Sequence, residues 1–377
     1  MRFIPHSHIV SHAETAVTPF LFNVIFPTVK RLRTLWPVIL LILVAVYFLV
    51  KLLSSRGETE TEKVDKSSSS NRPVEVFFTR SGGNPEKELV SFINSAREYV
   101  HVAIFELELE DVVRALIDAK RRGVDVRVVM DDRMKRKWAT KKLKAEGIPV
   151  VFDNRRPYMH NKFVVVDGRA VWSGSMNFKE SSVYRNDNNA FIIFSPEVAR
   201  NYEKEFQEMF SAHLFGPESP RNTHCCFKVS DLYLENYFAP EDSIARRIVE
   251  IIGNARKSVR FAAFSFTDDD IGRAMVDAHR RGVEVVGVIE ARSVKNKGSE
   301  YRRLRRAGIK VLKDGNRYIM HNKYIIVDDS IVITGSYNFS NSARKRNDEN
   351  VVIFFKPWIA ERYVRDFQRI LNEAVSK

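Results

Sequence analysis

Two stretches of the chain place a histidine two residues before a lysine, and the same downstream pattern follows both. Residues 159–177 read MHNKFVVVDGRAVWSGSMN, and residues 320–338 read MHNKYIIVDDSIVITGSYN. After each lysine come four residues of β character, an aspartate and a Gly-Ser-x-Asn sequence. A pattern of this length that occurs twice in one chain indicates a shared function rather than coincidence.

The histidine and the lysine of each stretch are expected to point to one side of a strand. Residues i and i+2 of a strand face the same way, and β-branched residues follow both pairs. His160 with Lys162, and His321 with Lys323, would therefore place an imidazole beside an ammonium group. Such a pair suits an anion-binding surface. The alternative is a solvated strand end with incidental basic residues, which the second copy argues against.

The composition is that of a globular protein with a basic balance. The 377 residues are enough for two domains, and 44% of them are hydrophobic. The net charge of +14 favours anionic partners such as phospholipid head groups or nucleic acid, although an ordinary basic surface explains it equally well. Cys225 and Cys226 are adjacent. Neighbouring cysteines are expected to stay unbonded and to form neither a disulfide framework nor a zinc site.

The N-terminal part of the chain contains a candidate membrane anchor. Leu35 to Val50 is an uncharged run, which reaches residue 53 if Lys51 extends its charge to the interface. A helix over 35–53 would cover about 28 Å, close to the thickness of the bilayer's hydrocarbon core. A signal peptide and a buried helix fit less well, because no A-x-A-like site follows and a polar tail comes next. We expect segments 1–34 (N-terminal), 35–53 (single-pass anchor) and 54–73 (flexible tether), on an undetermined side of the membrane.

From residue 74 onward the chain is a tandem repeat. Residues 119–126 read AKRRGVDV and residues 278–285 read AHRRGVEV, and the order of predicted strands and helices around them is the same. Strand–helix alternation predicts an α/β fold with a mixed sheet in each half. We expect a first repeat over 74–212, a connector over 213–237 and a second repeat over 238–377. Four glycines are expected to end helices, namely Gly123, Gly147, Gly282 and Gly308.

The duplicated H-x-K-x-x-x-x-D pattern with its trailing G-S-x-N resembles the signature of the phospholipase D superfamily. The resemblance covers nearly everything after residue 74. The amino-acid sequences of the motifs also resemble those of compact bacterial endonucleases, mitochondrial phospholipase D-like proteins and cardiolipin synthases. The resemblance implies that the halves pack about a pseudo-two-fold axis, so that one monomer brings both motifs into a single site.

The resemblance also implies a phosphodiester reaction that proceeds through a phosphohistidine, without metal or cofactor. One histidine attacks phosphorus, and the other protonates the leaving oxygen and then activates water or an alcohol. An H-x-K pair is a poor metal chelator, because the ammonium repels cations. Asp167 and Asp328 complete the catalytic motifs and are expected to hold their backbone. The groups expected around the phosphate oxygens are Lys162, Lys323, Asn177, Asn338, Ser175 and Ser336.

The two halves differ at one position that follows each motif. Residues 185–189 read RNDNN and residues 346–350 read RNDEN, so that Glu349 stands opposite Asn188. A carboxylate behind an imidazole favours the imidazolium form. We expect Glu349 to back His321, which would then be the acid, with His160 as the nucleophile. Asp187 could restore the missing carboxylate, and a surface role for Glu349 is the alternative.

The sequence therefore predicts a membrane-tethered phosphodiesterase that acts on phospholipids. The open alternatives are an endonuclease for DNA or RNA, a cardiolipin synthase and a catalytically silent binding module. The expected partners are a phospholipid membrane and, for the nuclease, nucleic acid. Basic runs at 133–144 and 295–310 could grip a polyanion, although solvated helix faces are the commoner explanation.

Overall fold

The computed structural model describes residues 44, 46–47, 72–81 and 83–376. It divides into two units, 1–71 and 72–377. The expected N-terminal segment, anchor and tether lie outside the described residues, apart from three helical residues at 44, 46 and 47 and the first two residues of the folded unit, 72 and 73. Within the described part of the chain, no helix is both long and apolar enough to cross a bilayer.

The first half of the folded unit is built on a seven-stranded mixed sheet with the order β1-β7-β6-β5-β2-β3-β4. Strands β2, β3 and β4 run parallel, and the other neighbours are antiparallel. The strands are β1 (Val74–Phe78), β2 (Tyr99–Ile104), β3 (Asp125–Met130), β4 (Val150–Phe152), β5 (Lys162–Val166), β6 (Ala170–Gly174) and β7 (Asn189–Ile193). The helices are α2 (Pro85–Asn94), α3 (Glu110–Arg121), α4 (Trp138–Ala145), α5 (Glu180–Tyr184) and α6 (Pro196–Phe210).

The second half repeats this plan on an eight-stranded sheet with the order β12-β11-β10-β13-β14-β15-β9-β8. Its strands are β8 (Cys226–Val229), β9 (Leu232–Ala239), β10 (Ser258–Ala263), β11 (Glu284–Ile289), β12 (Lys310–Lys313), β13 (Lys323–Val327), β14 (Ile331–Gly335) and β15 (Glu349–Phe355). Its helices are α7 (Ile244–Gly253), α8 (Asp269–Arg280), α9 (Tyr301–Arg306), α10 (Asn341–Lys345) and α11 (Pro357–Val375). The two mixed sheets confirm the predicted α/β repeat.

The connector differs from the expectation in two respects. It contains β8 and most of β9, and β9 pairs with β15, so the expected boundary at residue 238 falls inside a strand of the second sheet. Cys225 and Cys226 also form a disulfide, so the expectation of unbonded cysteines is wrong. Their Cα atoms are 3.8 Å apart, closer than in most disulfides, which is why adjacency alone argued against the bond.

Helix α3 shows how the local sequence sets the elements. Its acidic first turn and its basic last turn complement the helix dipole, and its apolar residues fall on one buried face. The chain leaves the helix at Gly123, whose φ of +90° suits glycine. The other three predicted helix-ending glycines also have positive φ. Helix α2 ends at Asn94, and β2 begins at Tyr99.

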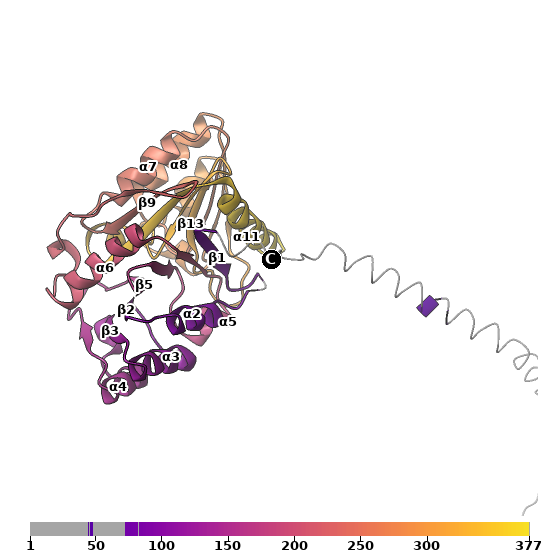
Figure 1. Ribbon diagram of the computed structural model, residues 1–377. Coiled ribbons are helices and arrows are strands. Elements are labelled where there is room, and N and C mark those ends of the chain that lie inside the picture. The colour runs from indigo at the N-terminus through magenta and orange to yellow at the C-terminus, as the bar shows by residue number, and fades with distance from the viewer. Residues whose placement is uncertain (1–43, 45, 48–71, 82, 377) are drawn as a thin grey trace, which may run out of the picture. The chain divides into compact units, whose positions relative to one another are not determined.

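The core of the folded unit has three parts. Helices α2, α3 and α4 cover the outer face of the first sheet, and α7 and α8 cover the outer face of the second. The central part joins the inner faces of both sheets with the apolar sides of α6 and α11. Figure 1 shows these layers, with α3 and α4 on one side, α7 and α8 on the other, and β5, α6 and β13 between them. Residues at the starts of the motif strands β5 and β13 belong to this central part, so both strand starts lie at the interface between the halves.

Candidate active site

Each motif histidine is bound by a loop of the opposite half. The His160 N–H donates to the Asp348 carbonyl (2.9 Å), and the His321 N–H donates to the Asp187 carbonyl (2.8 Å). Isolated β-bridges join the same segments, Met159 with Asp348 and Met320 with Asp187. The contacts repeat with the halves exchanged, as a two-fold relation requires. Both motifs therefore lie in one site between the halves.

The imidazoles are oriented by different residues. His160 Nδ1 lies 2.7 Å from Glu349 Oε2, and His321 Nδ1 lies 2.9 Å from Asn188 Oδ1. The predicted pairing of Glu349 with His321 is therefore wrong. The physical reason is the crossing of the loops, since the segment before β15 bridges to the motif of the first half. Asp187 does not replace the missing carboxylate, because its side chain points into a separate ion-pair network.

The surrounding hydrogen bonds fix the proton on the inner ring nitrogen of His321. The Asn189 N–H donates to Ser175 Oγ (3.1 Å), and Ser175 Oγ donates to Asn188 Oδ1 (2.9 Å). Asn188 Nδ2 donates to the Ser182 carbonyl (2.9 Å). Asn188 Oδ1 is thus an acceptor, and His321 Nδ1 must carry a hydrogen. This leaves Nε2 as the nitrogen available for chemistry.

The same arrangement stands behind His160. The Asn350 N–H donates to Ser336 Oγ (3.0 Å), and Ser336 donates to Glu349 Oε2 (2.7 Å). The carboxylate accepts from His160 Nδ1, so Nε2 of His160 is also free. Ser336 and its counterpart in the first half therefore orient the residues behind the imidazoles. Sequence reasoning had expected both hydroxyls at the phosphate.

Lys162 and Lys323 are almost completely buried, each with 1% exposure. Each ammonium group donates to the carbonyl of its own motif histidine (2.6 Å) and lies 5.0 Å from a phenylalanine ring centroid, Phe105 or Phe264. Burial lowers the pKa of Lys162 to about 7 and that of Lys323 well below its usual value. A bound phosphate anion would favour the charged form of both lysines.

The histidines and the glutamate also have shifted pKa values. Burial, and then the nearby lysine charges, hold the pKa of His160 and His321 well below the usual value. Burial raises the pKa of Glu349 to about 7, against the attraction of Lys162. The site without substrate therefore favours neutral imidazoles, the form in which a ring nitrogen can attack.

Four buried asparagines join the halves beneath the motifs. Asn189 Nδ2 donates to Asn322 Oδ1, and Asn350 Nδ2 donates to Asn161 Oδ1, both at 2.8 Å. Sequence reasoning missed these residues. The available signal was the duplicated asparagine inside M-H-N-K and at the end of R-N-D-x-N. Their contacts fix the two motif strands against each other.

Asp167 and Asp328 do not reach the site, although they were counted with the catalytic motifs. They follow the far ends of β5 and β13 with φ near +50°. Asp167 accepts the backbone N–H groups of residues 97–99, and Asp328 accepts those of residues 256–258. Partial burial opposes ionisation, but these donors hold the pKa of both carboxyls below the usual value. Both aspartates anchor the backbone, as the sequence had suggested.

Asn177 and Asn338 are also not aimed at a phosphate by their contacts in this structure. Asn177 Nδ2 donates to Glu106 (2.8 Å), a residue that sequence reasoning missed. The Oδ1 atoms of both asparagines are buried without a hydrogen-bond partner. The glycines before them are required, because a Cβ at Gly174 or Gly335 would collide with the backbone of β7 or β15.

Of the first basic run, Arg133 reaches the site. Its guanidinium lies 4.1 Å from the Tyr158 ring centroid and 4.3 Å from that of Phe105, and Asp131 pairs with it (2.7 Å). The lysines of α4 lie on an exposed helix face. Three carboxylates nearby, Asp131, Asp132 and Asp153, could approach one metal ion. Asp131 already pairs with Arg133, and Asp153 accepts the Asp132 N–H. These contacts stabilise the loop that follows β3.

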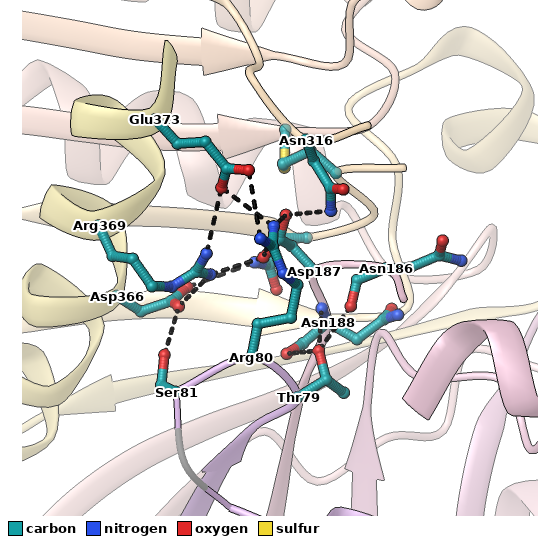
Figure 2. A network of polar contacts seen from close by, with 12 residues as sticks. Thr79, Arg80, Ser81, Asn186, Asp187, Asn188, Asn316, Asp366, Arg369 and Glu373 are labelled. Carbon is teal, nitrogen blue, oxygen red and sulfur yellow. Dashed lines mark hydrogen bonds and ion pairs between the residues drawn. The ribbon is translucent and has the colours of Figure 1, made fainter. Parts of the chain in front are cut away.

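An ion-pair network stands behind the segment that holds His321 (Figure 2). The buried Asp187 carboxylate contacts Arg369 (2.6 Å), Arg80 (3.1 Å) and Asn316 Nδ2 (2.6 Å). Arg369 also pairs with Asp366 of α11 (2.8 Å). The network ties the end of β1, the helix α11 and the loop before β7 together. Since the Asp187 carbonyl accepts the His321 N–H, the network also supports the catalytic histidine.

The profile of the family described as "Cardiolipin synthase, PLD-like domain" matches the chain twice, over residues 89–210 and 248–371, together more than half of its length. The chain belongs to the phospholipase D superfamily. As in other members, the sequence carries an H-x-K motif in each matched part. The matches coincide with the two α/β halves.

Several curated phospholipase D relatives match part of the chain. A phospholipase D of Rickettsia bellii is 38% identical over 130 residues, which are 34% of this chain and 65% of the relative. A phospholipase D of Rickettsia felis is 33% identical over 43% of this chain and 82% of the relative. The mitochondrial cardiolipin hydrolase of Mus musculus is 35% identical over 35% of this chain and 60% of its own. The chain thus spans under two thirds of some of these relatives.

Solved structures support the phospholipase D fold. A phosphatidylserine synthase of Haemophilus influenzae superposes with a TM-score of 0.61 at 14% identity, over 80% of this chain and 86% of the other. At this identity the likeness concerns the fold alone. The superposition extends over both halves, in agreement with the tandem arrangement.

Proposed function

We propose that the protein hydrolyses phospholipids in the manner of phospholipase D, through a phosphohistidine on His160. The observation that carries the proposal is the asymmetric pair behind the imidazoles, with a carboxylate at His160 and an amide at His321. It makes the two histidines suited to different steps of one reaction.

The sequence led us to expect the carboxylate behind the acid, but the carboxylate at His160 also suits a nucleophile. When His160 Nε2 attacks phosphorus, the ring gains positive charge in the transition state. Glu349, bonded to Nδ1, stabilises that charge as it develops, and interactions that strengthen in the transition state accelerate the reaction. Behind an acid, a carboxylate would stabilise the starting imidazolium and oppose proton release. The neutral amide of Asn188 therefore suits His321 as the acid.

His321 must be the imidazolium when it acts as the acid, and the negative charge of a bound phosphodiester favours its protonation at Nε2. The N–P bond forms at His160 Nε2 while the P–O bond to the head-group alcohol breaks, and His321 Nε2–H gives its proton to that leaving oxygen. In the second step His321 Nε2 takes a proton from water, whose oxygen attacks phosphorus, and the N–P bond breaks. Lys162 and Lys323 stabilise the phosphate oxygens in both steps. Replacing water by an alcohol gives head-group transfer.

Phospholipid is proposed as the substrate for two reasons. The relatives named above are phospholipases D and a cardiolipin hydrolase. The apolar run at residues 35–53 would hold the site close to head groups, and we propose it as a single-pass anchor. The net charge of +14 also favours an anionic surface.

A trapping experiment tests the mechanism. Full-length protein is mixed with head-group-labelled phosphatidylcholine or phosphatidylglycerol in vesicles with EDTA, and phosphoprotein is sought under alkaline quench, which preserves phosphohistidine. His321→Asn should accumulate the phosphoenzyme when the substrate has a good leaving group, and His160→Asn should not. The reverse pattern would show that His321 is the nucleophile and that the roles proposed here are wrong. Loss of activity in EDTA would contradict the metal-free reaction, and cardiolipin formed from phosphatidylglycerol would indicate a synthase.

Endonuclease activity is the second candidate. It is favoured by Tyr158, which is 44% exposed beside His160 with Arg133 over its ring, an arrangement that can stack on a base. Single-stranded DNA offered in the same assay decides between the substrates. Nicking that His160→Asn abolishes, without release of labelled head group, would replace the lipase proposal.

A further inference from the structure

The second half contains a cavity that the proposed reaction does not use. It lies between α7, α8 and α10 and has a volume of about 590 Å³, but no motif histidine or lysine lines it. One part of its wall is apolar, formed by Ile244, Ala245, Val249 and Ala274. The rest carries four cationic side chains, namely Arg246, Arg273, Arg344 and Lys345.

The first half fills the equivalent space with a side-chain bridge. There Tyr184, the last residue of α5, hydrogen-bonds to Glu86, the second residue of α2. The corresponding positions of the second half, the last residue of α10 and the second of α7, hold Lys345 and Ala245. Both of these line the cavity. The cavity therefore lies where the first half has this bridge, and Lys345 places a cation there.

Polar groups in the cavity wall lack protein partners. Tyr337 lies between the site residues Ser336 and Asn338, is 1% exposed, and has a buried hydroxyl with no hydrogen bond. Asp268, which does not line the cavity, pairs with Arg344 (3.5 Å). Helix α7 begins at the cavity without a side-chain cap. The Ile244 N–H already donates to the Asp242 carbonyl (2.9 Å), so the next two N–H groups, of Ala245 and Arg246, are the donors that the helix start offers.

The charges at the cavity favour an anion. Its lining acids are partly occupied, because Asp270 pairs with Arg273 and Arg344, Asp277 pairs with Arg280, and Asp242 accepts the Phe238 N–H. A second hollow continues along α8 from the shared residues Arg273 and Asp277, and its lining adds Arg280, Arg303 and Arg306. Cationic side chains therefore outnumber acidic ones along the whole groove.

We propose that this cavity is a second ligand site, which binds a phosphate ester that carries a hydrocarbon chain. The arginines and Lys345 supply charged donors for the phosphate, and the apolar wall accepts the chain. Neither a free anion nor a neutral hydrocarbon satisfies both surfaces. The site is separate from the catalytic imidazoles, so the proposal holds whether the substrate is lipid or nucleic acid.

The probe for this site is an alkyl phosphate of about eight carbons with a photoreactive diazirine in its chain. Full-length protein in neutral phosphatidylcholine vesicles is cross-linked and the labelled peptides are mapped. We expect label on α7 and α8, displaced by octyl phosphate and by phosphatidic acid, but poorly by octanol or inorganic phosphate. Equal displacement by octanol would refute phosphate recognition. Equal displacement by inorganic phosphate would refute the role of the chain.

Two sets of variants sharpen the test. Ala245→Glu with Lys345→Tyr installs the bridge of the first half and should abolish labelling of α7 and α8. Arg273→Ala should weaken labelling about tenfold, the effect of about one charged hydrogen bond. Arg114→Ala, at the equivalent place on α3, should leave it unchanged. Labelling that persists in the folded bridge variant, or that falls equally in both arginine variants, would overturn the proposal.

Discussion

At the scale of single residues, Glu349 and Asn188 are equivalent in position but not in charge. Glu349→Gln should slow formation of the phosphoenzyme about a hundredfold, the range expected for loss of one preorganised charge in the transition state. Single-turnover quenched flow measures this step directly. The rate of hydrolysis of the phosphoenzyme should change less, because His321 is the general base in that step. Equal effects on both steps would contradict the division of roles.

Asn188→Asp should shift the pH dependence of the first step. The new carboxylate raises the pKa of His321, which must be protonated to act as the acid. The alkaline limb of the rate should therefore move to higher pH, and Ser175→Ala should not reproduce that shift. A profile that stays in place, or moves to lower pH, would show that His321 is not the acid.

Asp167→Ala should affect stability and not chemistry. Three backbone N–H groups lose their acceptor at the far end of β5, which should lower the free energy of unfolding by about 1–3 kcal/mol. The kcat of the folded fraction should stay close to that of the wild type. Urea titration and initial rates in the same buffer give both quantities. A large fall in kcat without unfolding would place Asp167 in the catalytic machinery after all.

The sequence identified the reactive side chains but not their contacts. His160, His321 and both lysines were predicted from their spacing, and they converge. The partner of Glu349 could not be predicted, because the loop that carries it bridges to the other half. The hydroxyls of Ser175 and Ser336 were also misjudged, since their role depends on backbone donors that only the paired strands bring close.

At the scale of elements, α11 supports His321 from behind. Arg369→Met should leave Asp187 with a weaker set of partners and destabilise the protein by about 2–4 kcal/mol. This is somewhat less than for a fully buried ion pair, because the Arg369 side chain is 27% exposed. The matched control is Arg365→Met on the same helix, whose side chain is 61% exposed and forms a surface pair. Thermal and urea unfolding compare the two. Equal losses in the free energy of unfolding would show that the network stabilises the protein no more than a surface ion pair does.

The same variant separates positioning from stability. At a temperature where Arg369→Met remains folded, and with a substrate whose leaving group needs no acid, hydrolysis of the phosphoenzyme should slow more than its formation. The network supports His321, which such a substrate requires for hydrolysis alone. Arg369→Lys should restore part of the rate. The internal repeat shows that the fold does not demand this arginine, because Glu208 occupies the equivalent position of α6.

The order of strands and helices was predictable from periodicity and from the helix-ending glycines. Strands β8 and β9 were not, because β9 joins the sheet by a long-range pairing with β15, and β8 then pairs with β9. The short connector sequence gives no sign of these contacts. The end of α2 at Asn94 is also not evident from the sequence. Residues 95–98 are compatible with helix, but the chain turns there so that the carboxylate of Asp167 can receive its backbone N–H groups.

At the scale of the whole molecule, the interface between the halves is electrically uneven. Near His321, Asp187 and Asp366 face Arg80 and Arg369. On the other side, Asp348 pairs with Arg155 (3.3 Å) among further acids, which are Glu205, Glu208, Glu241 and Asp242. Burial raises the pKa of Asp348 to about 7 and that of Glu241 to about 8.

This acidic side should make stability depend on pH. Carboxyls whose pKa is raised by folding add stability below about pH 4, and that contribution is lost as the pH rises through about 7–8. Glu205→Gln should therefore raise the free energy of unfolding at pH 8 by at least about 1 kcal/mol relative to pH 5. The exposed Glu361→Gln is the control. Urea titrations at both values test this, and a gain that is equal at pH 5 and pH 8 would contradict it.

The crossed loops also bear on how such a chain can arise and change. One half alone would have to meet a second copy to complete either imidazole, and identical copies would present identical residues behind both. Duplication followed by fusion removes that constraint, because each loop then mutates without altering its twin. A difference such as that between Glu349 and Asn188 is therefore open to a chain with two separately encoded halves and closed to a pair of identical copies.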